Sequence, residues 1–427
     1  MDKNFSFANI TPLGSGIRQA DHDADFAVVS YLGGIYLAEI THEHDQSVDS
    51  RRVFAYSLEQ ERWITVYTGQ LTGEWDRTLS TPGVRSEIRI ITASETGPDV
   101  MLIRFTSCLG VELLRSEDGK HFTVESGEPS ENTPEKIIGS DQDSLVGRVN
   151  TEVNHYFVFR QLLVHRDHLF GVPAEGTEIA PNLLLHCPYG RGEAAWVQAC
   201  LPGFGQQDNR AVSTLISFGG VLYAAAANAA RGFEIWRQKD TDASDPNTSD
   251  PREMWEPVLI RGAYGYAHNT EVLSMVVHKD ALYIVAEADF SRQATAARYG
   301  EDPGFEVIRL HRSGRWELLI GTLRTSPQGL QVPLSGLGPG LDRLDKMMPL
   351  SFAANDQALF LATWNKAGFQ LWMSEDGEEW ATIRQPDFAG FYQIESCQAL
   401  SVGKAIVLAF DIENLDGTRE RQLWVGK

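Results

Sequence analysis

"GFQLWMSEDGEEW", from Gly368 to Trp380, decides the fold, because its first half recurs as "GFEIW" from Gly232 and "GFEVI" from Gly304. Around each occurrence, two apolar stretches joined by a short turn precede the GF pair, and a stretch that opens at tryptophan follows it. Short apolar runs bounded by glycine, asparagine and aspartate are typical of strands and turns. Each unit is therefore predicted to form four antiparallel β-strands.

The same pattern recurs along the whole chain, with the signature residues lost in the weaker copies. The units begin near Phe26, Ser86, His155, Gly203, Ala263, Lys346 and Ile394. Seven units of roughly 50 to 75 residues, each with four short strands, predict an all-β, seven-bladed β-propeller in one domain over residues 1–427. The last unit lacks a fourth strand, so the segment from Asn4 to Ile10 is expected to complete it and close the ring.

The conspicuous tryptophans occupy repeated positions. Trp236 and Trp372 share a place in the third strand of their units, and the fourth strand opens at Trp255, Trp316 and Trp380. Side chains alternate across a strand, so large rings in one register fit the contacts between blades. The Asp-Gly pairs of "SEDGKHF" and "SEDGEEW" are interpreted as tight turns in which the Asp carboxylate accepts bonds from the turn's own amides. Both features are interpreted as scaffold.

Composition limits the partners. Lys and Arg number 37 against 58 Asp and Glu, a formal charge of −21, which disfavours nucleic acid and anionic lipid surfaces. The chain has neither an apolar run long enough for a membrane span nor a signal-peptide pattern, so a cytoplasmic protein without a membrane partner is expected. The four cysteines are scattered without metal-like spacing and are expected to be buried free thiols.

A functional site is expected at the mouth of the central channel, where the first strand of each unit begins and the second strand ends. Small polar Thr214, Ser274 and Ser351 align in a column predicted to face the channel, beside an apolar column at the blade contacts. The catalytic candidates at the mouth are Arg85, Glu87, His155, Glu271 and Tyr392. The ligand-binding candidates are His22, Asp25, Arg210, His268, Asn269, Lys346, Trp364 and Glu395.

Two features at the mouth have simpler alternatives. Asn209 and Asn269 follow glycines at the same spacing, which also suits side chains that stabilise a turn. "DHDAD" (Asp21 to Asp25) and "HEHD" (His42 to Asp45) carry carboxylates and imidazoles that suit a divalent cation such as calcium, or form a solvated acidic loop. No cofactor is otherwise predicted.

The stretches "LYAAAAN", "LFLATWN" and "GFQLWMSEDGEEW" resemble a broad group of bacterial propellers whose repeats read LYxGTxN…GxEIWRSxDGxxW. The Asp-Gly hairpins also resemble the structural Asp-boxes of sialidases, one residue shorter. One propeller class is similar in a more specific way: the propeller portion of cylindrocyclophane-type alkylating enzymes, which join nucleophiles to alkyl chlorides at the propeller mouth. Those enzymes carry a calcium-binding N-terminal domain with no counterpart here. Their catalytic Arg and Tyr have no matching motif, so Arg85 and Tyr392 are candidates from location alone.

Two classes of function remain open from the sequence. The first is a small-molecule biosynthetic enzyme, with alkylation or cyclisation of a nucleophile as its chemistry. In that case Arg85 or Lys346 holds an anion, and Glu87, Glu271 or His155 handles a proton. The second is a propeller that binds a ligand, protein or carbohydrate without catalysis, which predicts exposed apolar surface on a rim or equivalent sites between blades.

Overall fold

The structure is a computed structural model, and it describes the following parts of the chain. They are residues 6–12, 24–42, 48–72, 86–93, 100–107, 109–124, 159–166, 168–173, 179–188, 196–239, 254–264, 269–288, 304–341, 347–365, 368–383, 391–414 and 419–427. Within these parts the strands form seven four-stranded antiparallel sheets and one separate hairpin, and the fold is a seven-bladed β-propeller. The predicted fold class is confirmed.

Two compact units divide the chain, and each is described by itself. Unit 1 holds blades 1, 2 and 7. Blade 1 consists of β2 (Ala24–Tyr31), β3 (Gly34–His42), β4 (Val48–Ser57) and β5 (Arg62–Thr72), and blade 2 of β6 (Ser86–Ala93), β7 (Val100–Ser107), β8 (Gly110–Ser116) and β9 (Thr123–Val124). Blade 7 consists of β28 (Phe391–Val402), β29 (Ala405–Asn414), β30 (Arg419–Gly426) and β1 (Phe7–Asn9).

Unit 2 holds blades 3 to 6. Blade 3 consists of β10 (Phe159–His165), β11 (His168–Pro173), β12 (Leu185–Pro188) and β13 (Val197–Gln198), and blade 4 of β14 (Ala211–Phe218), β15 (Val221–Ala227), β16 (Glu234–Gln238) and β17 (Trp255–Leu259). Blade 5 consists of β18 (Asn269–His278), β19 (Ala281–Ala288), β20 (Glu306–His311) and β21 (Trp316–Ile320), and blade 6 of β24 (Met348–Ala354), β25 (Leu359–Asn365), β26 (Gly368–Ser374) and β27 (Ala381–Thr382).

The N-terminal strand completes the C-terminal blade, as predicted. Phe7 pairs with Gly426 and Asn9 with Trp424, so β1 is the fourth strand of the sheet β28–β29–β30. Pairing the two ends of the chain in one sheet protects an edge that would otherwise be open.

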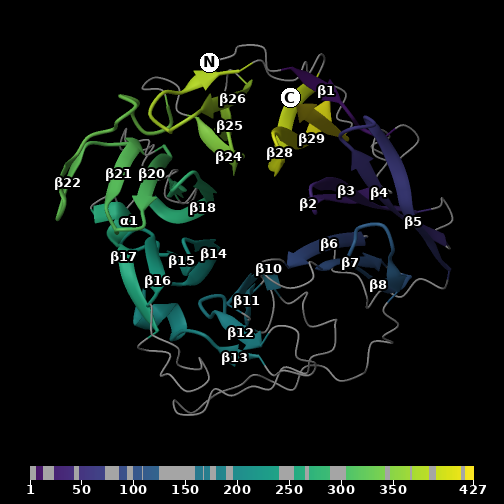
Figure 1. The fold of residues 1–427 in the computed structure, drawn as a ribbon, viewed down its shortest axis with the longest axis horizontal. Helices are drawn as coiled ribbons and strands as arrows, with labels where there is room; N and C mark the ends of the chain where they lie inside the picture. The colour runs from purple at the N-terminus through teal and green to yellow at the C-terminus, as the bar shows by residue number, and fades with distance from the viewer. Residues whose placement is uncertain are drawn as a thin grey trace. The chain divides into compact units, whose positions relative to one another are not determined.

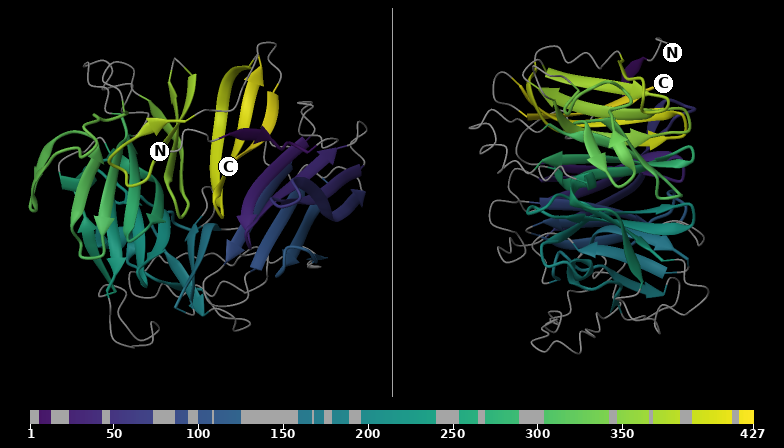
Figure 2. Two further views of the ribbon diagram at one scale, coloured as in Figure 1. Left: turned by 45° about the horizontal axis from the view of Figure 1, so that its top comes forward. Right: turned by 90° about the vertical axis from the view of Figure 1, so that its left-hand side faces the viewer.

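First strands lie side by side within unit 2. The strand β18 contacts β14 on one side and β24 on the other (Figure 1). The neighbouring sheets of this unit stack face to face in both views of Figure 2. The first strands also share a bulge, which falls between Val212 and Thr214 in blade 4 and between Val272 and Ser274 in blade 5. A bulge shifts the side chains that follow it, so these strands present equivalent positions.

The tryptophans pack between blades, as predicted. Trp236 and Trp255 are buried in a core that joins blade 4 to residues of blade 3 such as Phe170, and Trp316 lies in the core between blades 4 and 5. The ring of Trp236 stacks on Phe204 with centroids 5.2 Å apart. The aromatic signature therefore belongs to the scaffold.

The glycine of the GF pair allows two backbones to meet. A Cβ on Gly232 would lie 2.5 Å from the amide nitrogen of Gly262, and one on Gly304 would lie 2.9 Å from that of Gly340. In blade 4 the contact is fixed by a bond from the Gly262 amide to the Phe233 carbonyl, 3.0 Å. Gly262 lies in α1 (Arg261–Tyr264), a single turn with left-handed backbone. Such close approach of backbones leaves no room for a side chain.

The Asp-Gly hairpins form the predicted turns. The carboxylate of Asp376 accepts the amide of Glu378 at 2.8 Å and that of Glu379 at 3.3 Å, while Gly377 has φ +86°. Asp118 accepts bonds from the two corresponding amides of its own turn. Both hairpins are structural.

Cys187, Cys200 and Cys397 are buried free thiols, as predicted, and Cys108 lies outside the described residues. No helix among the described residues is long and apolar enough to cross a membrane.

Candidate functional site

Blade 4 contains a buried carboxylate that accepts hydrogen bonds from side chains of the same blade. Glu234, the third residue of "GFEIW", accepts the side-chain amide of Asn209 at 2.8 Å and the indole N–H of Trp236 at 3.0 Å. Asn209 also donates to the carbonyl of Gly203, 3.0 Å away. Buried polar groups are stable only when hydrogen-bonded. Asn209 is therefore a structural residue, which agrees with the simpler of its two sequence interpretations.

Blade 5 repeats this carboxylate with a different set of partners. Asn269 donates to Glu306 at 2.6 Å, as Asn209 does to Glu234. Ile308 stands in the place of Trp236, and the missing donor is replaced by Arg324, whose guanidinium forms two 2.8 Å bonds to the two oxygens of Glu306. Such a two-fold Arg–carboxylate pair is the strongest polar contact available to a buried carboxylate.

Arg324 comes from a hairpin that does not belong to any blade. The strands β22 (Arg324–Ser326) and β23 (Gly329–Gln331) form a two-stranded sheet of their own next to β21 (Figure 1). Arg324 also donates to the Ala263 carbonyl at 2.8 Å and lies 5.6 Å from the centroid of the Trp316 ring. Gln328, in the turn of the hairpin, accepts the Trp316 amide at 3.1 Å, so Arg324 and Gln328 both anchor the hairpin to blade 5.

The first two strands of blade 5 carry a pair of carboxylates. Glu271 of β18 lies directly opposite Glu287 of β19 in the strand register. Opposed residues of an antiparallel pair have Cβ atoms about 4.5–5.5 Å apart, on the same face of the sheet. In blade 4 the corresponding pair is Ala211 and Ala227. Blade 4 forms the same pair of strands with alanines at these positions, so folding does not require the carboxylates. They are therefore candidates for function.

The pair has an unusual affinity for protons. Burial, and after it the neighbouring charge of Glu271, raise the pKa of Glu287 to about 7. Two neighbouring carboxylates that are partly buried resist holding two negative charges, so Glu287 keeps its proton to a higher pH than an isolated glutamate does. A carboxyl group with a pKa near the working pH both gives and takes a proton readily.

Glu287 faces the contact between blades 5 and 6. Tyr283 and Val285 alternate with their neighbours along β19 and pack in the core against Phe352 and Leu361 of blade 6. Glu287 is two residues beyond Val285 and so lies on the same face, at the end of that core. The apolar neighbours explain why burial is the larger cause of its raised pKa.

Trp364 is the counterpart of Glu287 in the next blade, but its side chain does not face the carboxylate pair. It lies opposite Met348 in blade 6, at the position that Glu287 occupies opposite Glu271 in blade 5. Its neighbour Thr363 donates to the sulfur of Met347, a residue of the core that faces blade 5. Alternation therefore places the Trp364 ring on the other face of its blade.

The other sequence candidates have varied places. Arg210 is exposed, and its backbone amide donates to the Ala227 carbonyl at 2.9 Å. Four more lie on described strands, although their side chains are not described: Asp25 on β2, Glu87 on β6, and Tyr392 and Glu395 on β28. Five lie outside the described residues: His22, Arg85, His155, His268 and Lys346. Of the predicted catalytic residues, the structure thus describes the side chain of Glu271.

The acidic segments singled out for a cation, Asp21 to Asp25 and His42 to Asp45, lie outside the described side chains. Among the side chains that are described, no three His, Cys, Asp or Glu residues are grouped so as to hold a metal ion.

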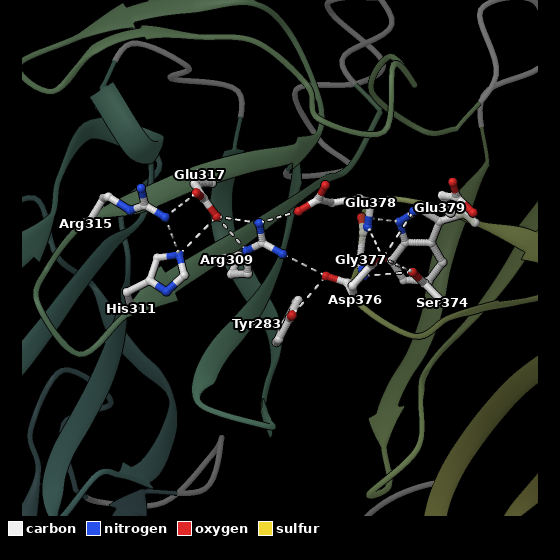
Figure 3. Close-up of polar contacts among 11 residues, drawn as sticks. Tyr283, Arg309, His311, Arg315, Glu317, Ser374, Asp376, Gly377, Glu378 and Glu379 are labelled. Carbon is white, nitrogen blue, oxygen red and sulfur yellow. Dashed lines mark hydrogen bonds and ion pairs between the residues drawn. The ribbon is translucent and has the colours of Figure 1, made fainter.

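A second polar cluster, shown in Figure 3, joins the outer strands of blades 5 and 6. Arg309 forms 2.6 Å ion pairs with Glu317 of its own blade and Glu378 of the next, and donates to the Asp376 carbonyl at 3.0 Å. Burial raises the pKa of Glu317, but His311, Arg309 and a further arginine outweigh it and lower that pKa overall. Every charge in this cluster is balanced, so it acts as a connection between blades.

A third cluster, buried in unit 1, joins blades 1 and 2. The fully buried Arg51 lies 3.9 Å from the carboxylate of Asp49 and 3.7 Å from that of Glu112. Ser107 donates to Asp49, and burial followed by the charge of Glu112 raises the pKa of Tyr67 to about 12. Arg51 lies between two carboxylates and is closed to solvent, which indicates a structural role. Sequence reasoning did not find this cluster, because its members are far apart in the chain.

Comparison with known proteins supports the fold. No protein family matches the sequence, and no curated protein matches it. Among solved structures, the polysaccharide lyase Uly1 has a TM-score of 0.50 at 8% identity, over 94% of this chain and 88% of that one. A prolyl endopeptidase has a TM-score of 0.47 at 9% identity, covering 94% of this chain and 50% of that one.

An acylaminoacyl peptidase of Pyrococcus horikoshii is similar at a TM-score of 0.47 and 8% identity, over 95% of this chain and 52% of that one. This chain thus spans about half the length of each of the two peptidases. At identities this low, structural similarity shows a shared fold alone. It does not indicate that this chain has the substrates or activities of those proteins.

Proposed function

We propose that the protein is an enzyme that acts on a small molecule and uses Glu271 and Glu287 to move a proton. The observation that carries the proposal is the opposed carboxylate pair of blade 5, which replaces two alanines in the otherwise equivalent strands of blade 4. Burial and mutual repulsion move the pKa values of two neighbouring carboxyl groups apart. Such pairs recur in enzymes that use general acid–base catalysis.

The reaction class proposed is activation of a nucleophile. A deprotonated Glu287 accepts a proton from an N–H or O–H group, which leaves a lone pair on the nucleophile. Attack on an alkyl chloride forms the new bond to carbon and releases chloride. This last step rests on the resemblance of the repeats to cylindrocyclophane-type alkylating enzymes. The substrate is a small molecule, and neither nucleic acid nor membrane is part of the proposal.

Turnover by Glu287 variants tests the proposal. Primary amines and phenols are offered together with alkyl chlorides, and products are detected by mass. Glu287→Gln should lower kcat/KM at least about 100-fold, the usual contribution of a general base. Wild-type kcat/KM should rise through pH 7 as Glu287 loses its proton.

Asp280→Asn is the matched control, since this exposed residue lies at the β18–β19 turn, at the other end of the same strands. It should leave kcat/KM unchanged. Full turnover by Glu287→Gln, or the absence of products with the wild type at every pH, would contradict the proposal.

A specific observation favours a second candidate, a propeller that binds a protein without catalysis. Four large apolar side chains on and beside the β22–β23 hairpin are between 47% and 65% exposed: Leu323, Leu330, Val332 and Leu334. Clustered apolar groups of this kind mark protein contacts. If this candidate is correct, Leu330→Ser with Val332→Ser removes a co-purifying partner, whereas Glu287→Gln leaves that partner bound.

A further inference from the structure

The hairpin formed by β22 and β23 has two unlike faces. Thr325 lies opposite Leu330 in the strand register, and side chains alternate between the two faces of a strand. Arg324 and Ser326 therefore lie on the inner face, where both side chains are largely buried. Exposure continues to alternate in the residues that flank the two strands, so the outer face consists of exposed residues: Leu323, Thr325, Leu330, Val332 and Leu334.

The side chains of the outer face do not hold the hairpin to blade 5. Arg324 on the inner face bonds to Glu306. Gln328 in the turn accepts the Trp316 amide and donates to the Gly314 carbonyl at 2.9 Å. The apolar members of the outer face are 47% to 65% exposed, and none of them belongs to the described hydrophobic cores of blade 5. Their burial would be gained only in a contact with another molecule.

The segment that carries the outer face is poor in charge. From Gly321 to Leu341 it contains a single charged residue, Arg324, although 22% of the residues of the whole chain are charged. Arg324 lies on the inner face and is neutralised there by Glu306. The outer face is therefore apolar and uncharged, on a protein whose formal charge is −21.

We propose that two copies of this chain associate through the outer face, hairpin against hairpin across a two-fold axis. The hairpin is at the periphery of blade 5, since β22 lies beyond β21 on the side away from the first strand β18 (Figure 1). In a two-fold contact the same surface stands on both sides, so it must be complementary to itself. An apolar face meets this condition, whereas a charged face repels its own copy. This proposal is independent of the role given to Glu271 and Glu287.

Charge distinguishes a second copy from other partners. A formal charge of −21 opposes contact between two copies through the acidic parts of their surfaces and leaves the uncharged hairpin as the place where they can meet. The same charge attracts basic proteins, but these pair their Lys and Arg with carboxylates of the contact surface. The five residues of the outer face include no carboxylate. A partner that matches this face is itself apolar and uncharged at the contact, as the outer face of a second copy is.

The size of the outer face limits the strength of the contact. Stable dimers bury about 800 Å² on each subunit. The four apolar side chains, each between 47% and 65% exposed, supply only part of this area. The dimer is therefore weak and dissociates on dilution.

Sedimentation equilibrium of the full chain over a range of concentrations tests the inference. The wild type should pass from one chain to two as the concentration rises towards about 1 mM, the range in which weak contacts form. Leu330→Ser combined with Val332→Ser should weaken dimerisation at least about tenfold, which is 1.4 kcal/mol. Sodium chloride screens the repulsion between two acidic copies, so a high salt concentration should strengthen the wild-type dimer.

Ile64→Ser combined with Val124→Ser is the matched control, because these side chains are 43% and 52% exposed on the fourth strands of blades 1 and 2. It should leave dimerisation unchanged, and both double variants should keep the melting temperature of the wild type. Four results would overturn the inference: a wild type that stays monomeric at every concentration, a dimer that the changes at Leu330 and Val332 do not weaken, a dimer that the control weakens equally, or a dimer that salt weakens. If the wild type is monomeric and the changes at Leu330 and Val332 release a different protein, the outer face belongs to that protein.

Discussion

Blades 4 and 5 are neighbouring copies of one unit that share their scaffold and differ at one end. Both hold a buried glutamate by an asparagine at the beginning of the first strand, Glu234 by Asn209 and Glu306 by Asn269. Both also use the glycine of the GF pair for a close backbone contact. Features kept in both copies are explained by folding alone.

The differences collect in blade 5. There Ala211 and Ala227 of blade 4 have become Glu271 and Glu287. The carboxylates bring repulsion and burial of charge, which destabilise a fold rather than support it. Residues that occur in only one copy of a repeat and destabilise the fold are therefore candidates for function. Four measurements test the differences between blades 4 and 5.

The largest loss of stability is expected when Glu306, one of the two buried glutamates, loses its arginine partner. Arg324→Leu removes the only guanidinium that the described residues place on Glu306 and leaves a carboxylate fully buried. Breaking a buried ion pair in this way costs about 3–5 kcal/mol, seen as a lower free energy of unfolding in denaturant.

Arg231→Leu in blade 4 is the control for this change, because its ion pair with Asp208 is exposed and should contribute less than about 1 kcal/mol. Combining Arg324→Leu with Glu306→Gln should recover most of the lost stability, since no charge is then buried. Equal losses for the two arginines would show that the blade 5 pair is not what holds Glu306.

A smaller loss is expected in blade 4. Trp236→Phe keeps the ring that stacks on Phe204 but removes the indole N–H that Glu234 accepts at 3.0 Å. A hydrogen bond to a charged group contributes about 1.5–3 kcal/mol, and Asn209 still binds the carboxylate. The free energy of unfolding of this variant should lie between those of the wild type and Arg324→Leu, and a loss as large as that of Arg324→Leu would contradict the order.

The last effect depends on pH. The folded pKa of Glu287, about 7, lies above its ordinary value of 4.5. The folded protein therefore holds this proton more tightly, and the stability it contributes is complete below pH 4.5 and lost as the pH rises through 7. Between pH 5 and pH 8 the free energy of unfolding should fall more in the wild type than in Glu287→Gln. Identical slopes would show that Glu287 does not titrate in this range.

The fold could be predicted from the sequence because its determinants repeat. The GF pairs, the tryptophans that open fourth strands and the orphan strand near Phe7 all follow one pattern, and each is needed in several blades. Glu271, one half of the proposed carboxylate pair, was also singled out from the sequence, since it opens an apolar stretch at the expected mouth.

The rest of the site depends on contacts that no repeat encodes. Glu287 was missed because it reads as one more residue of the apolar strand in "LYIVAEA", and only the register shows that it opposes Glu271. Arg324 lies in a hairpin that has no counterpart among the described strands of blades 4 and 6, so alignment of repeats could not connect it to Glu306.

The most direct test of the central claim is the pKa of Glu287, followed through its carboxyl carbon by NMR during a pH titration. The account predicts a midpoint near 7 in the wild type and a lower one in Glu271→Gln, where the neighbouring charge is gone but burial remains. A wild-type midpoint at the ordinary value of 4.5 would contradict it, because blade 5 would then hold two independent surface carboxylates instead of a coupled pair.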